Sequence, residues 1–321
     1  MSGFVEAHSA EVLKAAGRIK PYVRRTPTLT TDLDPALRLK AECFQVTGSF
    51  KVRGAFNAVL SLMARDPHPT GVIAVSSGNH AQAVALAARS VGIPALILIP
   101  EDANPAKVAA TRALGAEVIQ QGITFANREQ RLREVMAERG FTLVHPFDDW
   151  DVIHGQGTAA AEMLADEPGI EVIAAPVGGG GLLSGSAIAA KSSRPSMTVI
   201  GVEPVVADDA YQSSKAGTIR SLPAAPNTIA DGVRTTAIGA RTFEVMFANA
   251  LVDEIVTVTE EEIATAVRVA WTRLHIALEP TGALPLAAYV AGKLPSDRPT
   301  GLILSGGNAN LQTVAKLLGT P

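Results

Sequence analysis

Short, uninterrupted apolar runs alternate along this chain with longer stretches in which apolar residues recur every three or four positions. A run such as Val172–Pro176 is typical of a strand covered on both faces, because neither side carries polar residues. The stretch 260–276 opens with Thr259-Glu260-Glu261-Glu262, which has the spacing of a helix capping box. This alternation predicts an α/β fold with mainly parallel sheets. The predicted strands are 72–76, 95–100, 117–120, 142–144, 172–176, 199–202, 255–258 and 302–304; further helices are predicted at 80–91 and 106–114, and a loop at 208–240.

Composition excludes several classes of protein. The 321 residues are 47% hydrophobic, which is enough for a two-lobed unit or two domains. The net charge of −3 and the lack of a basic stripe disfavour a nucleic-acid binder. No apolar run reaches about 18 residues, and the acidic N-terminus lacks the apolar segment of a signal peptide. Cys43 is the only cysteine, so a disulfide framework and multi-cysteine metal sites are excluded. We therefore expect a cytoplasmic protein without a membrane or nucleic-acid partner.

Glycine- and serine-rich segments follow three of the predicted strands. They are 76–80, 177–181 and 305–308. In parallel α/β sheets, ligands bind beyond the carboxyl ends of the strands. The three segments are therefore expected to form one shared site.

Lys51 lies in the segment Thr47-Gly48-Ser49-Phe50-Lys51-Val52-Arg53-Gly54-Ala55, at a predicted boundary between loop and helix. A lysine at such a boundary is commonly a surface charge. Here its neighbours are small or apolar, and a partly desolvated amine has a lowered pKa and reacts with carbonyl groups. The spacing alone leaves both interpretations open.

Four consecutive glycines, Gly178, Gly179, Gly180 and Gly181, join the strand at 172–176 to a helical stretch that starts near Leu182. Glycines let the backbone approach an anion closely, and amides at a helix N-terminus can hold a phosphate. A flexible turn is the alternative. The segment matches neither the dinucleotide nor the nucleoside-triphosphate motif, and Glu203, the acid at a suitable distance for a ribose, precedes a proline. A smaller phosphate ligand is therefore favoured.

Two more segments supply polar groups. Ser76–His80 combines hydroxyl, amide and imidazole groups that suit a carboxylate, although serine and asparagine are also ordinary helix caps. Ser305, in Ser305-Gly306-Gly307-Asn308, suits a heteroaromatic nitrogen, although it also fits an ordinary turn. A reactive lysine, a phosphate loop, a carboxylate loop and a ring partner are together what pyridoxal-phosphate (PLP) chemistry requires.

On these motifs the chain resembles the fold-type II PLP enzymes, in the family of serine/threonine dehydratases and serine racemases. The resemblance runs from Arg25-Thr26-Pro27 to Asn308 and implies a two-lobed, tryptophan synthase β-like fold. It implies a large PLP-binding domain at 1–47 and 147–321, a small mobile domain at 48–146, and a homodimer. The motifs that carry it are 47–55, 77–82, Gly155-Gln156-Gly157-Thr158, the four glycines, Gly201-Val202-Glu203-Pro204 and Glu279-Pro280-Thr281-Gly282.

The resemblance also implies the reaction. The enzyme would remove the β-hydroxyl and the amino group from serine, threonine or 3-hydroxyaspartate, giving a 2-keto acid and ammonia. Lys51 would bind the cofactor covalently and then exchange the proton at Cα. Phe50 would lie beside the ring, Asn79 would bond its phenolic oxygen, and Ser305 would face its nitrogen. The amides of Gly178, Gly179, Gly180, Gly181 and Leu182 would hold the phosphate.

Further residues are implied by the racemase branch of the family. Ser77 would be a second acid/base on the face opposite Lys51, although an N-cap serine looks the same in sequence. Glu203, Asp209 and the main-chain oxygen of Ala207 would bind Mg²⁺, Ca²⁺ or Mn²⁺; a solvated acidic loop is the alternative. The remaining substrate-binding candidates are Ser76, Asn79, His80, Arg128 and His145, and Arg128 fits a surface ion pair equally well.

Some features depart from the family pattern, and three other functions are considered. The stretch 31–40 looks short, Val46 replaces a usual polar residue, and no regulatory domain is expected after the last helix. A β-replacement enzyme like cysteine synthase is disfavoured by the motif around Lys51. A non-catalytic PLP-binding protein is disfavoured by Lys51, Ser77 and Ser305, and a nucleotide-binding module by the missing ribose acid and phosphate-loop lysine.

Overall fold

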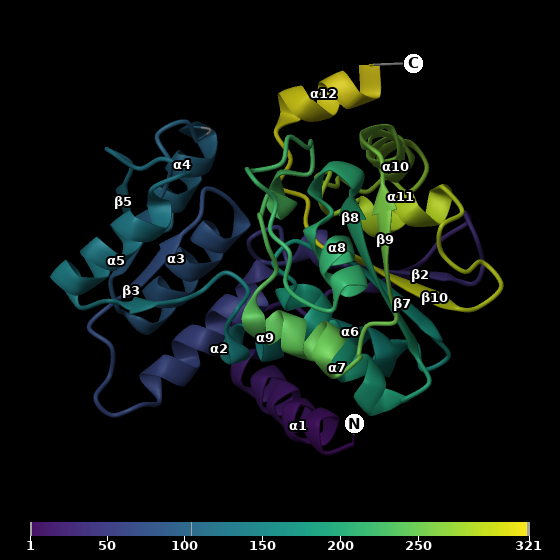
Figure 1. Cartoon of the computed structure of the whole chain (residues 1–321), viewed down its shortest axis with the longest axis horizontal. Helices are drawn as coiled ribbons and strands as arrows, with labels where there is room; N and C mark the ends of the chain where they lie inside the picture. The colour runs from purple at the N-terminus through teal and green to yellow at the C-terminus, as the bar shows by residue number, and fades with distance from the viewer. Residues whose placement is uncertain (1, 104, 320–321) are drawn as a thin grey trace.

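A computed structural model describes residues 2–103 and 105–319 of the chain, which contain two separate sheets (Figure 1). The larger sheet has six strands in the order β1-β2-β10-β7-β8-β9, and the smaller has four in the order β5-β4-β3-β6. All neighbouring strands are parallel except β1 and β2. The predicted fold class is confirmed. The strands are β1 (Thr28–Thr30), β2 (Leu37–Ala41), β3 (Val72–Val75), β4 (Ala95–Leu98), β5 (Glu117–Ile119), β6 (Thr142–Leu143), β7 (Val172–Pro176), β8 (Thr198–Pro204), β9 (Glu254–Val258) and β10 (Thr300–Leu304).

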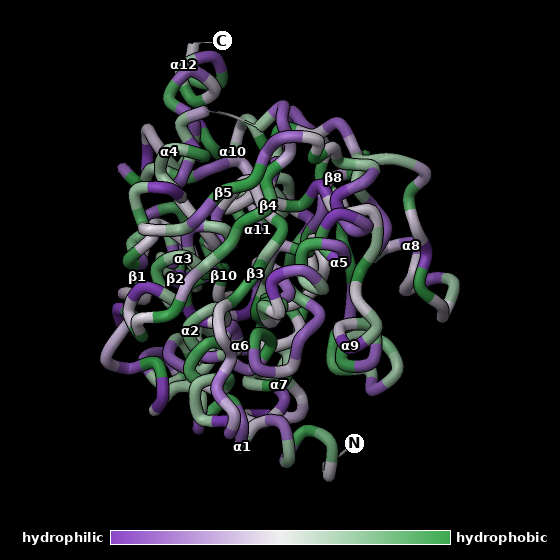
Figure 2. The backbone as a smooth tube through the Cα atoms, turned by 90° about the vertical axis from the view of Figure 1, so that its left-hand side faces the viewer, coloured by the Kyte–Doolittle hydropathy of each residue, from purple (hydrophilic) through white to green (hydrophobic). Residues whose placement is uncertain are grey.

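Helices cover both faces of each sheet, which is why the central strands are continuously apolar. In β7, Ile173 and Ala175 pack into one core with residues of α1, α6 and α7, whereas Val172 and Ala174 pack into another with α10 and α11. Figure 2 shows β3 and β4 of the smaller sheet as hydrophobic segments. The longer helices are α1 (Ser2–Ile19), α2 (Lys51–Met63), α3 (Asn79–Val91), α4 (Pro105–Ala113), α5 (Arg128–Arg139), α6 (Trp150–Asp166), α7 (Gly181–Ser193), α8 (Asp209–Ala216), α10 (Glu260–Thr272), α11 (Leu284–Val290) and α12 (Leu311–Gly319); α9 (Ala240–Phe243) is a single turn.

The structure corrects parts of the prediction. The stretch 208–240 is not all loop, because Asp209–Ala216 forms α8. The helix expected at 260–276 ends at Thr272. Strands β1 and β2 were not predicted, because Arg38 and Lys40 interrupt the apolar pattern of β2; Lys40 is nevertheless fully buried. None of the described helices combines the length and hydropathy needed to span a bilayer.

A buried ionic network fixes the start of α2 against the larger sheet. The Arg53 guanidinium donates to both carboxylate oxygens of Glu42, at 2.7 and 2.8 Å, and both of these side chains are fully buried. It also donates to both oxygens of Glu162 on α6, at 2.9 and 2.8 Å. Lys40 on β2 completes the network by donating to Glu162 at 2.7 Å. Because Arg53 lies two residues after Lys51, this network holds the first turn of α2 in place.

Candidate active site

Lys51 is the first residue of α2, and its side chain is held inside the protein. Its Nζ donates a hydrogen bond to the carbonyl oxygen of Pro146 at 2.8 Å. Burial lowers the pKa of Lys51 to about 8, against the opposing effect of the Glu279 carboxylate. A minority of the amine, far larger than for an ordinary lysine, is therefore uncharged and nucleophilic near neutral pH.

Ser305 lies beside this lysine, at the end of β10. Its carbonyl oxygen accepts a hydrogen bond from the amide of Phe50 at 3.0 Å, and Ser49 and Gly306 form a bridge next to it. The side chain of Ser305 is 1% exposed, and its Oγ has no hydrogen-bond partner among the described residues. A buried hydroxyl without a partner is costly, so this atom suits a polar ligand group.

The four glycines form a tight loop between β7 and α7. Gly180 has a φ of +93°, in the left-handed region that favours glycine. A Cβ on Gly179 would overlap the ring of Phe147, and one on Gly181 would approach the Phe147 backbone to 3.0 Å. The loop therefore requires glycine at these positions. It leads directly into the N-terminus of α7, where the first amides of the helix have no partners within it.

Asn79, the first residue of α3, connects the smaller sheet to the larger one. Its Nδ2 donates to Oε1 of Glu279 at 2.7 Å, and its Oδ1 accepts from Nδ2 of Asn308 at 2.8 Å. Glu279 is buried, and burial raises its pKa to about 7. The motif 279–282 was noted in the sequence, but the contact of Glu279 with Asn79 was not predicted.

The segment before α3 places the predicted carboxylate loop. Ser76 and Ser77 are half-buried, and Ser76 Oγ accepts the amide of Gly78 at 3.2 Å. His80 is buried, and its Nε2 lies 2.8 Å from the carbonyl oxygen of Val144, so this nitrogen carries the proton. Burial lowers the pKa of His80 to about 3, and the imidazole is therefore neutral.

Comparison with known proteins places the chain in a family. Residues 19–306 match the family model described as pyridoxal-phosphate dependent enzyme. The chain belongs to the pyridoxal-phosphate-dependent enzymes.

Its relatives cover almost the whole chain. It is 43% identical over 314 residues to an L-threo-3-hydroxyaspartate ammonia-lyase of Saccharomyces cerevisiae, covering 96% of this chain and 95% of that one. It is 44% identical over 320 residues to a serine racemase of Arabidopsis thaliana, covering 95% of each. Among solved structures, a threonine deaminase from T.th. matches with a TM-score of 0.88 and 48% identity, covering 94% of this chain and 98% of that one. Maize serine racemase matches with a TM-score of 0.89 and 40% identity, covering 96% and 95%.

The residues present fit the cofactor of this family. Lys51 offers a desolvated amine, and Ser305 offers an unpartnered hydroxyl. The glycine loop offers backbone amides at the N-terminus of α7. Phe50 precedes the lysine, and Asn79 is oriented by two hydrogen bonds. Contacts connect their segments: Phe50 bonds Ser305, Asn79 bonds Glu279, and Lys51 bonds Pro146, whose neighbour Phe147 packs against the glycine loop. That the segments form one shared site stays a prediction.

The two remaining substrate-binding candidates differ in their surroundings. His145 is half-buried, its Nδ1 accepts the amide of Asp148 at 2.8 Å, and burial lowers its pKa. The charges of Asp148, Glu129 and Asp149 oppose this effect of burial on the pKa. Arg128 instead packs its guanidinium over the ring of Phe125, 3.6 Å from the centroid, and lies 3.7 Å from Glu129.

The predicted metal-binding residues meet at the end of β8. Glu203 accepts the amides of Tyr211 at 2.7 Å and Ala210 at 3.3 Å, and Asp209 Oδ2 is buried without a partner among the described residues. Burial raises the pKa of Glu203 to about 9 and that of Asp209 to about 7. No group of three or more His, Cys, Asp or Glu side chains in the described chain could hold a metal ion. A site here would need a main-chain ligand such as the carbonyl of Ala207.

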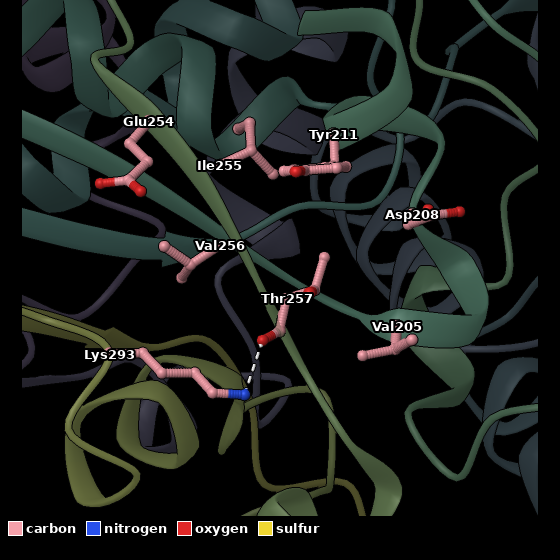
Figure 3. Close-up of a pocket in the computed structure, with 8 residues that line it drawn as sticks. All are labelled: Val205, Asp208, Tyr211, Glu254, Ile255, Val256, Thr257 and Lys293. Atoms are coloured by element: carbon pink, nitrogen blue, oxygen red, sulfur yellow. Dashed lines mark hydrogen bonds between the residues drawn. The ribbon is translucent and has the colours of Figure 1, made fainter. Parts of the chain in front are cut away.

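A cavity of about 400 Å³ lies next to this acidic loop, over the edge strand β9 (Figure 3). Lys293 donates to the carbonyl oxygen of Thr257 at 3.0 Å and so covers one backbone group of the sheet edge. The residues named above as the cofactor site do not contribute to this cavity. It is lined by Val205, Asp208, Tyr211, Glu254, Ile255, Val256, Thr257 and Lys293.

Proposed function

We propose that this enzyme catalyses the β-elimination of a small 3-hydroxy amino acid, releasing a 2-keto acid and ammonia. The observation that carries the proposal is that a desolvated Lys51 amine and an unpartnered Ser305 hydroxyl belong to segments joined by the hydrogen bond from the Phe50 amide to the Ser305 carbonyl. Relatives named as a 3-hydroxyaspartate ammonia-lyase, a serine racemase and a threonine deaminase support it. Serine, threonine and 3-hydroxyaspartate are accordingly the candidate substrates.

Each residue of the site has a separate role in this reaction. PLP, when bound, accepts the substrate amine and withdraws electrons from Cα. The Lys51 amine exchanges the Cα proton, and its pKa of about 8 suits it to do so near neutral pH. Ser305 offers the ring nitrogen a neutral hydroxyl, which does not hold it protonated and so favours elimination over transamination. Ser76, Ser77, Asn79 and His80 hold the substrate carboxylate, which supplies orientation.

A racemase side activity belongs to this proposal. Ser77 directly precedes Gly78 and the start of α3, and its side chain is half-buried. A serine hydroxyl on the face of Cα opposite Lys51 would return the proton from the other side and invert the centre. The relatives named as serine racemases support this second activity.

A divalent cation at Glu203, Asp209 and the Ala207 carbonyl is also proposed. Two carboxylates that lie close together and are removed from solvent need either protons or a cation. Asp209 Oδ2 lacks a partner among the described residues, which is the state expected of a ligand atom. Oxygen ligands suit Mg²⁺, Ca²⁺ or Mn²⁺.

Expectations about closure, substrate contacts and assembly also belong to the proposal. The segment 48–146 is proposed to close over the site and exclude water, because the Asn79–Glu279 hydrogen bond already joins it to the larger sheet. Arg128 and His145 are proposed to contact the substrate in this closed form. The enzyme is proposed to be cytoplasmic and to act as a homodimer. Analytical ultracentrifugation of the holoenzyme would test the dimer.

The experiment is a substrate panel on the purified holoenzyme. L- and D-serine, L-threonine and both diastereomers of 3-hydroxyaspartate are supplied with and without EDTA, and keto acid and enantiomers are measured together. Keto acid is expected from at least one of them, and Lys51→Ala should abolish it. Lys20→Ala, a change at an exposed lysine, is the matched control and should keep full activity. If no substrate gives keto acid or changes enantiomer, the proposal fails; cysteine formed from serine and sulfide would then indicate β-replacement.

A further inference from the structure

Thr242 is a fully buried residue of α9 that makes direct contact with the glycine loop. Its Oγ1 donates to the carbonyl oxygen of Gly179 at 2.8 Å and accepts the amide of Gly239 at 2.9 Å. The carbonyl of Gly239 is a more distant acceptor, at 3.1 Å. The Gly239 amide also reaches the Gly179 carbonyl, at 3.3 Å. The side chain of Thr242 therefore anchors one particular peptide group of the loop.

The peptide group that follows Gly179 has a fixed geometry. In a planar trans peptide, the C=O and the N–H of the next residue point to opposite sides. A Gly179 carbonyl directed at Thr242 therefore turns the N–H of Gly180 away from α9. Gly180 then takes its φ of +93°, and its own carbonyl accepts the amide of Ser184 at 2.8 Å as α7 begins.

The loop is also closely packed on two sides. A Cβ on Gly180 would come within 2.8 Å of Thr242 Cβ, and Phe147 occupies the corresponding space at Gly179 and Gly181. The peptide plane between Gly179 and Gly180 thus has little room to rotate while the hydroxyl of Thr242 is in place.

We infer that Thr242 is a positioning residue for the cofactor phosphate: it orients the Gly180 amide, without itself contacting the phosphate. This inference rests on the proposed role of the glycine loop in cofactor binding. Without the hydroxyl, the Gly179 carbonyl would keep only the longer bond from the Gly239 amide, at 3.3 Å, so the peptide could rotate and misdirect an amide that must meet the anion. The effect is specific to the phosphate, because the ring and the aldehyde of the cofactor are held by other residues.

The test compares PLP with pyridoxal, which has the same ring and aldehyde but no phosphate. Dissociation constants are measured by absorbance and fluorescence titration of the enzyme after its cofactor has been removed. Thr242→Val keeps the shape of the side chain and removes the hydroxyl, whereas Thr242→Ser keeps the hydroxyl. We expect Thr242→Val to weaken PLP about tenfold, or about 1.4 kcal/mol, with pyridoxal unchanged. Thr242→Ser should stay close to the wild type for both ligands.

The outcomes separate the possible roles. Unchanged PLP affinity in Thr242→Val, or an equal loss for PLP and pyridoxal, would overturn the inference. If Thr242→Val does not fold, Thr242→Cys replaces it, since its thiol is only a weak donor; an intermediate, phosphate-specific loss is then expected, and none would overturn the inference. The ³¹P resonance of bound PLP should also shift in the valine variant. If the wild type itself did not prefer PLP to pyridoxal, the role of the glycine loop would fail first.

Discussion

Replacing Arg53 with methionine should severely destabilise this protein, because it leaves a buried carboxylate without its main partner. Glu42 is fully buried and receives two hydrogen bonds from Arg53. Among the described residues, Glu42 would keep only the hydrogen bond from Thr26, at 2.5 Å, and the nearby charge of Lys40. Breaking a buried ion pair from one side costs about 3–5 kcal/mol. We expect a loss of unfolding free energy of this size for Arg53→Met.

The matched control is Arg65→Met. Arg65 lies just beyond the C-terminal end of α2 and pairs with Asp151 at 3.4 Å, but its side chain is 62% exposed. Exposed pairs contribute about 0–1 kcal/mol, so this variant should be nearly as stable as the wild type. Both are measured by urea unfolding of the enzyme without its cofactor, followed by circular dichroism, with refolding checked to establish reversibility.

The destabilisation should also depend on pH. Burial alone would raise the pKa of Glu42, but the Arg53 guanidinium outweighs it and holds the pKa below its ordinary value of 4.5. The wild type therefore gains stability from this group above pH 4.5 and loses it as the pH falls through the lowered pKa. In Arg53→Met the guanidinium no longer opposes the effect of burial on the pKa of Glu42, so this carboxyl should protonate at a higher pH, and its protonation removes the unpaired buried charge. The difference in unfolding free energy between the wild type and Arg53→Met should therefore narrow below about pH 5.

A double variant shows whether the unpaired charge of Glu42 or the lost packing of Arg53 causes the destabilisation. Adding Glu42→Gln to Arg53→Met removes the unpaired charge and should recover part of the lost stability. The reasoning would be refuted if Arg53→Met cost no more than Arg65→Met, or if its cost were unchanged between neutral and acidic pH. No recovery in the double variant would mean that the packing of the arginine, and not its charge, matters at this position.

Three further predictions concern the site. Gly179→Ala should weaken PLP binding at least tenfold in a titration, because the added Cβ would overlap the Phe147 ring. The control Gly169→Ala has open space around it and should bind PLP as the wild type does. Equal PLP affinities of the two variants would count against cofactor binding by the glycine loop. Ser77→Ala should abolish the exchange of serine enantiomers in chiral chromatography. Because Ser76, Asn79 and His80 still hold the carboxylate, KM should rise while kcat for keto-acid formation stays within about threefold. Retained exchange would remove the proton-transfer role of Ser77. Asp209→Asn should lose the rise in melting temperature that Mg²⁺, Ca²⁺ or Mn²⁺ gives the wild type, with Asp208→Asn as control; a rise in both variants would exclude this metal site.

The strands could be predicted because both faces of each sheet are covered. Continuous apolar runs such as Val172–Pro176 are what that environment requires, and all eight predicted strands are present. Strand β2 was not predicted because its Lys40 is buried with the help of a partner, Glu162, that lies 122 residues away in the sequence. A hydrophobicity pattern cannot reveal a charge whose compensation comes from a distant part of the chain.

The same distinction applies to the site. Lys51, the glycines and Ser305 belong to local motifs that indicate their chemistry only when they are taken together, because each alone also fits a surface charge or a turn. Glu279 and Thr242 act through contacts with Asn79 and Gly179, which are 200 and 63 residues away in the sequence. Nothing in a lone threonine before a phenylalanine indicates that it anchors a loop. Such supporting residues become visible only when the tertiary contacts are known.

The hydrogen bond from Lys51 to Pro146 has a consequence for how the enzyme is loaded. Pro146 lies in the short connection between β6 and α6, and the next residue, Phe147, packs against the glycine loop. The Lys51 amine thus holds this connection in place. A reaction of this amine with an aldehyde has to break that hydrogen bond, so the new covalent bond forms at the expense of an internal one. Amide exchange along this connection should therefore change when the lysine reacts.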